Sequence, residues 1–124
     1  MKDVVQEAHA TGAQVIASFH DFNKTPSAAR LQTVVARAID AGADIVKIAA
    51  ATRSPGDIAK LLAILSAPAL PTSAMGMGQL GMASRVLFAS CGSILNYGWL
   101  HRPNVPGQWA AVEFKDLLKR MGAL

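Results

Sequence analysis

The sequence predicts an α/β fold in which a parallel sheet is built from four successive strand–helix units. Short apolar runs alternate with longer segments whose apolar residues recur at helical spacing, and most of the intervening loops are short. Strands and helices that alternate in this way form parallel sheets through right-handed crossovers. Hydrophobic residues make up 52% of the chain and charged residues 16%, which suits buried parallel strands and excludes a disordered chain.

The first two strand–helix units are indicated by apolar patterning and by residues that begin or end helices. Gly12 separates an amphipathic opening segment from an apolar run that is typical of a strand. Pro26 opens the next helix, because proline suits a first helical turn, and Gly42 closes it. The elements expected here are a helix over 2–11, a strand over 14–19, a polar loop over 20–25, a helix over 27–41 and a strand over 44–49.

The second half of the chain repeats the pattern. Ser54 and Pro55 begin a helix, and a glycine-rich loop over 76–81 follows the third strand. A longer loop over 98–108 precedes the last helix. The elements expected here are a helix over 54–65, a strand over 69–75, a helix over 82–89, a strand over 93–97 and a helix over 110–121.

Two architectures fit this order of elements: a small doubly wound sheet, or part of a (β/α)8 barrel. A whole barrel needs about 250 residues, so four βα units correspond to half of one. Both architectures gather functional groups at the C-terminal ends of the strands. The residues at those positions are therefore the first candidates for chemistry.

Lys47 is the most informative of them because it interrupts an otherwise apolar strand. The run from Asp44 to Ala51 is expected to be buried on both faces. Burial lowers the pKa of a lysine and supplies the neutral amine that a Schiff-base nucleophile requires. The alternative is a structural lysine that pairs with a carboxylate inside the fold.

His20 and Arg85 are expected at the same end of the sheet. The ordinary pKa of histidine suits a general acid/base, whereas a loop histidine can also simply cap backbone groups. Asp21 either orients the His20 imidazole or caps the following loop. Arg85 follows the glycine-rich loop, where its guanidinium either clamps a carboxylate or lies on a helix surface.

Other kinds of site are disfavoured. The glycine-rich loop lacks a Walker lysine, and the three histidines and one cysteine have no metal-ligand spacing, so neither a phosphate cradle nor a metal site is expected. The net charge of +4 comes mainly from scattered residues, which argues against a nucleic-acid partner and fits a small anionic substrate.

The cellular setting is indicated by Cys91 and by the apolar patterning. A single cysteine allows no internal disulfide, and its place in an apolar run suggests a buried, inert thiol. No run approaches the ~20 apolar residues of a membrane span, so no membrane partner is expected. Asp3 and Glu7 come too early for a signal peptide, and we expect a soluble, cytoplasmic protein.

Four motifs resemble those of the type I 3-dehydroquinate dehydratase family, in the family's order and over nearly the whole chain. They correspond to the family patterns S-x-H-D-F, A-D-x-x-K-x-A, M-G-x-x-G-x-x-S-R and P-G-Q. The matching segments are residues 18–22, 43–49, 77–85 and 106–108.

The resemblance implies a (β/α)8 barrel and the syn dehydration of 3-dehydroquinate to 3-dehydroshikimate in the shikimate pathway, without metal or cofactor. Lys47 would form an imine with the C3 ketone, and His20 would move a proton from C2 to the departing C1 hydroxyl. Arg85 would hold the substrate carboxylate, and Gln108 would bind hydroxyls from a closing loop. Apolar packing around the imine would come from Phe22, Met75, Met77 and Tyr97.

The chain departs from the family pattern in two ways. Asn104 stands where the family usually has a serine, and an amide there would still bind a substrate hydroxyl. The first four strands of the barrel have no counterpart, so the family's acid/arginine pair and its glutamate near the catalytic histidine cannot be assigned.

A half barrel leaves sheet edges unpaired. Three explanations are open. The chain is a fragment of a longer enzyme, or it pairs with a second copy or with a missing N-terminal half, or it rearranges into a small open sheet. The family's usual dimerisation makes a homo-oligomer the first expectation. Two other functions remain open: another Schiff-base enzyme such as a class I aldolase, and a non-catalytic half barrel that serves assembly.

Overall fold

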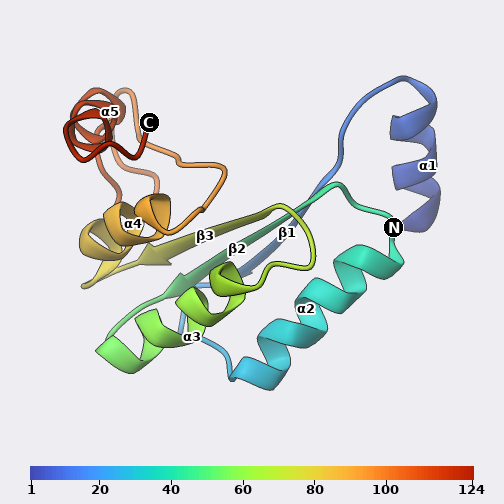
Figure 1. Cartoon of the computed structure of the whole chain (residues 1–124), viewed down its shortest axis with the longest axis horizontal. Helices are drawn as coiled ribbons and strands as arrows, with labels where there is room; N and C mark the ends of the chain where they lie inside the picture. The colour runs from blue at the N-terminus through green and yellow to red at the C-terminus, as the bar shows by residue number, and fades with distance from the viewer.

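The computed structural model describes all 124 residues and contains one parallel three-stranded sheet with five helices (Figure 1). The strands lie in the order β1-β2-β3. Their bounds are Ile16–Asp21 for β1, Ile45–Ala51 for β2 and Thr72–Met77 for β3. The helices are α1 (Lys2–Ala10), α2 (Ala28–Asp40), α3 (Pro55–Ser66), α4 (Gly81–Ser90) and α5 (Ala111–Arg120). The predicted parallel α/β organisation is confirmed.

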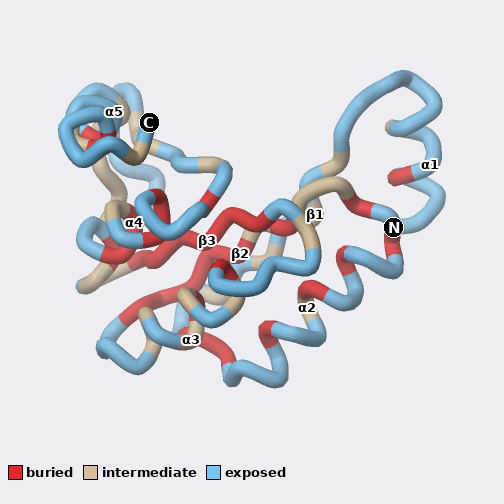
Figure 2. Tube along the Cα trace, viewed as in Figure 1, coloured by how far each residue is buried: buried red, intermediate tan, exposed pale blue.

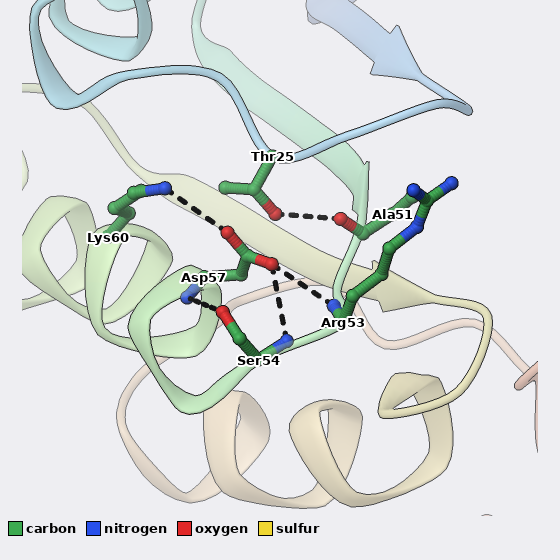
Figure 3. Close-up of polar contacts among 6 residues, drawn as sticks. All are labelled: Thr25, Ala51, Arg53, Ser54, Asp57 and Lys60. Carbon is green, nitrogen blue, oxygen red and sulfur yellow. Dashed lines mark hydrogen bonds and ion pairs between the residues drawn. The ribbon is translucent and has the colours of Figure 1, made fainter.

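Two of the helices, α2 and α3, begin where a serine side chain accepts from a free backbone N–H group. Ser54 and Asp57 form a capping box at the start of α3, with the Asp57 carboxylate accepting from the backbone N–H groups of Arg53 and Ser54 (Figure 3). The Lys60 ammonium donates to the same carboxylate at 3.1 Å. Beside this turn, the Thr25 hydroxyl donates to the Ala51 carbonyl at the end of β2. These bonds fix the connection from β2 to α3.

The strands extend further toward their C-terminal ends than the sequence suggested. Strand β1 begins at Ile16 and includes His20 and Asp21, which were expected in a loop. Backbone pairing explains the difference, because β1 stays in register with β2 as far as Asp21 opposite Ala50. At the other end of these strands, the Val15 N–H just before β1 donates to the carboxylate of Asp44 just before β2, at 2.7 Å. His20 therefore lies on the rigid sheet.

The expected fourth strand over 93–97 does not form. The segment follows β3, and the Ile94 N–H donates to the Thr72 carbonyl. The Ser93 hydroxyl, however, lies 3.0 Å from the Ala74 nitrogen and 3.3 Å from the Ala74 oxygen, where it replaces a backbone partner. Ser73 likewise donates its side-chain hydroxyl to the Leu95 carbonyl at 2.6 Å. Side-chain hydroxyls thus interrupt the backbone ladder that a strand over 93–97 would require.

The two faces of the sheet are different. One face carries Val46, Ile48 and Ala50, which pack against α2, α3 and α4 to form the main core. The core residues contributed by those three helices are Leu31, Val35, Ala38, Leu61, Leu65 and Phe88. Figure 2 shows the buried stretches concentrated along β2 and β3, whereas most of α1 is exposed.

The other face bears the functional side chains and has no helix against it. Ser18, Lys47 and Ser73 share one row across the sheet, and His20, Ala49 and Met75 share the next. Such rows of inward-pointing residues are a feature of barrel interiors. Helices on one face only exclude the doubly wound alternative, so the chain is half of a barrel wall.

Two further expectations concern the burial of Cys91 and the presence of a membrane-spanning helix. Cys91 is exposed and not buried, because it follows the last residue of α4, where the chain turns away from the core. No helix has both the length and the apolar character required to cross a membrane.

Candidate active site

A cavity of about 360 Å³ opens on the inner face of the sheet, toward the C-terminal ends of the strands. All nine residues that the sequence singled out line it, together with Ile16, Ser18, Ala49 and Val105. Ile16, Ser18 and Ala49 share strand faces with the predicted residues, since Ser18 lies two residues before His20 and Ala49 two residues after Lys47. The period of two along each strand is the signal that identifies these three, whereas Val105 lies in the loop over 98–108 and no such signal identifies it.

Lys47 and His20 form the polar centre of the cavity. Lys47 Nζ lies 2.8 Å from His20 Nε2, from neighbouring strands. The strand register places Ser18 opposite Lys47 and His20 opposite Ala49, so the contact is diagonal across the same face. The pair therefore depends on backbone positions that the sheet fixes.

The surroundings of Lys47 favour its neutral form. Desolvation, assisted by the positive charge of Arg85, lowers the pKa of the Lys47 amine below its ordinary value of 10.5. Neither of the two ion pairs in the chain involves Lys47, and no carboxylate lines the cavity. Within this chain no carboxylate pairs with Lys47, which favours the nucleophile over the structural lysine.

His20 is held by its strand and by an aromatic neighbour. Its ring stacks on Phe22, with centroids 6.0 Å apart and planes 9° from parallel. Desolvation and the charge of Lys47 lower the pKa of the His20 imidazole, which favours the neutral ring at neutral pH. The Asp21 carboxylate accepts from the N–H groups of Asn23 and Lys24, so it caps the loop rather than orienting His20.

Arg85 is a buried side chain, only 4% exposed, and not a helix-surface arginine. Its Nε donates to the Gly76 carbonyl at 3.0 Å, and one Nη donates to the Tyr97 carbonyl at 3.1 Å. Burial lowers the pKa of the Arg85 guanidinium, whose ordinary value is so high that the group remains a cation. It supplies a fixed positive charge at the wall of a cavity that contains no acid.

The loop over 98–108 forms the remaining wall of the cavity. Gln108 Oε1 accepts from the Asn104 backbone N–H at 3.0 Å, and the Pro106 carbonyl accepts from the Gly78 N–H at 2.8 Å. Gly107 has a φ of +78° and packs closely against Gly78 and Gly81. The P-G-Q motif and the glycine-rich loop are thus two halves of one tight contact.

That contact gives the glycine-rich loop a packing role. A Cβ at Gly81 would lie 2.7 Å from the Gly107 carbonyl oxygen, and a Cβ at Gly76 would meet the side chains of Ser84 and Thr52.

No group of three His, Cys, Asp or Glu side chains in the chain is placed to hold a metal ion. Among the cavity residues, Lys47, His20 and Arg85 are the ionisable groups suited to acid–base, nucleophilic and anion-binding chemistry.

Fold and site together define half of a (β/α)8 barrel with a lysine–histidine pair on its inner face. A solved 3-dehydroquinate dehydratase from Geobacillus kaustophilus HTA426 superimposes with a TM-score of 0.89 at 27% identity, covering 98% of this chain and 49% of its own. The type I 3-dehydroquinate dehydratase from Clostridium difficile, solved with covalently modified comenic acid, gives 0.85 at 32% identity, covering 97% and 49%.

The sequence comparisons name the family. The profile of the family described as type I 3-dehydroquinase matches residues 1–124, and the chain belongs to that family. It is 35% identical to the 3-dehydroquinate dehydratase of Klebsiella pneumoniae, over 95% of this chain and 49% of that protein. The corresponding protein of Methanocella arvoryzae is also 35% identical, over 90% and 51%. The chain thus spans about half the length of these relatives.

Proposed function

We propose that this chain carries the imine-forming half of a type I 3-dehydroquinate dehydratase. The observation that carries the proposal is the 2.8 Å contact between Lys47 Nζ and His20 Nε2 in a cavity without carboxylates. The contact supplies a nucleophilic amine and a proton carrier at one point, and Arg85 supplies a nearby positive charge. Membership of the family makes 3-dehydroquinate the substrate to test.

The first step is imine formation. The neutral Lys47 amine attacks the C3 ketone carbon, and the resulting carbinolamine loses water with a proton donated by His20. The product is an iminium ion that withdraws electrons from the neighbouring C2–H bond. A lowered lysine pKa favours the attack, because only the unprotonated amine has a free electron pair.

The second step is elimination. Neutral His20 takes the C2 proton, leaving an enamine, and the enamine electrons then expel the C1 hydroxyl. His20 returns the proton to that hydroxyl, so it leaves as water. A second water molecule hydrolyses the remaining iminium ion and releases 3-dehydroshikimate and free Lys47. Protons and electrons balance without an added cofactor.

Substrate binding is assigned to the charged and amide groups around the pair. The buried Arg85 cation would attract the substrate carboxylate, and Asn104 and Gln108 would offer amides from the loop that lines the same cavity. Phe22, Met75, Met77 and Tyr97 give the imine an apolar and aromatic lining, which would exclude bulk water once a partner covers the open side of the cavity. The reaction belongs to the shikimate pathway, and we expect it in the cytoplasm.

The open side of the cavity favours a second half barrel as partner. Strand β1 has β2 on one edge and no strand on the other, and Phe22 at its end is 64% exposed. We propose that a second copy of the chain, or a separate N-terminal half, covers this side. Gel filtration with light scattering distinguishes an isolated monomer from either assembly.

The same open side also supports a second candidate function, a half barrel that serves assembly without turnover. The two functions are separated by following the enone absorbance of 3-dehydroshikimate. Catalysis predicts turnover that is lost in Lys47→Met. It also predicts that Lys60→Met, which removes an equal charge on α3 away from the cavity, retains turnover. Substrate binding without turnover in the assembled protein would favour the assembly role.

A further inference from the structure

Tyr97 holds its aromatic ring over the candidate nucleophile. Lys47 Nζ lies 5.6 Å from the centroid of the Tyr97 ring, within the ~6 Å at which a cation is attracted to a ring face. The sequence motifs suggest only apolar packing at this position. The geometry adds an electrostatic interaction.

The other groups around Lys47 make that interaction important. His20 from β1 and Arg85 from α4 face the same cavity, and both are basic. No carboxylate lines the cavity. Apart from the Nε2 lone pair of neutral His20 at 2.8 Å, the face of Tyr97 is therefore the electron-rich surface that this chain offers to a positive charge on Lys47 Nζ.

Three hydrogen bonds fix the segment that carries Tyr97. Ser73 donates to the Leu95 carbonyl at 2.6 Å, and Arg85 donates to the Tyr97 carbonyl at 3.1 Å. The Asn96 side-chain amide donates to the Ser93 carbonyl at 3.0 Å. Ser73 is in register with Lys47, so the sheet row that contains the lysine also anchors the backbone leading to the ring.

We infer that the Tyr97 ring stabilises the cationic forms of Lys47, both the free ammonium ion and the iminium ion, through a cation–π interaction. The part concerning the iminium ion rests on the proposed function, whereas the part concerning the ammonium ion does not. An imine-forming lysine must be neutral when it attacks and cationic when it withdraws electrons. A neighbouring carboxylate would shift its pKa by about one to three units, which would hold the amine protonated. A ring face shifts the pKa by about half a unit and stabilises the cation while leaving a neutral fraction.

The test is the Lys47 pKa in ring variants of the whole chain. Competitive acetylation with acetic anhydride across a pH series, read by peptide mass mapping, reports the pKa of this one amine. Tyr97→Phe keeps the ring and should stay within about 0.2 unit of the parent, while Tyr97→Leu should lower the pKa by about half a unit. Tyr97→Trp, with the stronger ring, should match or exceed the parent value.

Two results would overturn the inference. Equal pKa values in the Leu and Phe variants would show that the ring has no effect, and an equal drop in both would assign the effect to the phenol hydroxyl. Circular dichroism identifies a variant that fails to fold. If Tyr97→Leu does so, the Lys47 pKa values of Tyr97→Trp and Tyr97→Phe are compared instead.

A second readout concerns the iminium ion. At a pH above the Lys47 pKa, where the free amine is neutral in both variants, trapping with 3-dehydroquinate and borohydride at limiting substrate should be about threefold slower in Tyr97→Leu than in Tyr97→Phe, the factor that corresponds to about half a pKa unit. Absence of trapping in every variant, with the acetylation order intact, would reject the proposed function and leave the effect on the ammonium ion standing. Equal trapping rates would contradict a role for the ring in the imine step.

Discussion

Lys47 Nζ and His20 Nε2 lie 2.8 Å apart on neighbouring strands, and a hydrogen bond at this distance requires that one of the two be neutral. Either the ammonium group donates to a neutral imidazole, or a ring N–H donates to a neutral amine. Desolvation lowers the pKa of both groups, and the charge of Lys47 lowers that of His20 further. The pair is therefore poised to exchange one proton, which is the operation that imine formation and elimination both require.

The first prediction concerns His20. His20→Asn should reduce turnover of 3-dehydroquinate by about a hundredfold to ten-thousandfold, the usual range for loss of a general acid/base. The Lys47 amine remains, so imine trapping should be slower but detectable. His9→Asn, which removes a histidine paired with Asp44 outside the cavity, is the matched control and should keep its turnover. Turnover in His20→Asn within about threefold of the parent would remove His20 from the mechanism.

The second prediction concerns pH. A protonated amine cannot attack a ketone, so imine trapping should rise with pH as Lys47 loses its proton. Because the Lys47 pKa is lowered, the rise should occur at a lower pH than for N-acetyl-lysine methylamide under the same conditions. Initial trapping rates between about pH 6 and 10 measure the difference. Coincident curves for the protein and the reference amine would show that the cavity does not activate Lys47.

The third prediction concerns Ser93, whose hydroxyl lies between the Ala74 nitrogen and oxygen. Ser93 is 4% exposed, so Ser93→Ala leaves a buried N–H without its partner and should lower the free energy of unfolding by about 1–3 kcal/mol. Ser90→Ala is the control, because Ser90 is exposed and bonds only within α4; its effect should stay within about 0.5 kcal/mol. Urea unfolding measures both, and equal stabilities would show that the serine is not needed to anchor the 93–97 segment.

The fourth prediction concerns Gly76. Gly76→Ala should lower the free energy of unfolding by about 1–3 kcal/mol, since the added methyl meets the side chains of Ser84 and Thr52, the latter at 2.7 Å. Gly56→Ala in α3 meets nothing closer than 3.7 Å and should be neutral or stabilising by up to about 1 kcal/mol. Thermal melts of the two variants should therefore move apart, and a Gly76→Ala protein as stable as the parent would contradict the packing.

Lys47 and His20 could be singled out because parallel α/β folds gather functional residues at the C-terminal ends of their strands, whereas Asn104, Gln108 and the apolar lining residues were named only through the family motifs. Lys47 was identifiable as one polar residue in an apolar strand, and His20 lies at the end of the strand beside it. The expectation of burial on both faces was too broad, because Val46, Ile48 and Ala50 reach the core while Lys47 faces an open cavity. Apolarity alone does not distinguish a barrel interior from a helix-covered face.

The missing fourth strand was not predictable from pattern. Residues 93–97 include the β-branched Ile94 and the aromatic Tyr97, which are common in strands, but whether a strand forms depends on where the Ser93 and Ser73 hydroxyls reach once β3 is in place. Local propensity contains no information about such tertiary competition for backbone groups. The same limit applies to Tyr97, because its position over Lys47 depends on how the 93–97 segment is held beside β3.

The central claim is that Lys47 of this chain forms an imine with 3-dehydroquinate. The most direct measurement is an intact-mass spectrum after incubation with 3-dehydroquinate and borohydride, followed by peptide mapping, with Lys47→Met as the control. The account predicts one reduced adduct, located on Lys47 and absent from the variant. No adduct on a folded chain, or an adduct that persists in Lys47→Met, would contradict it.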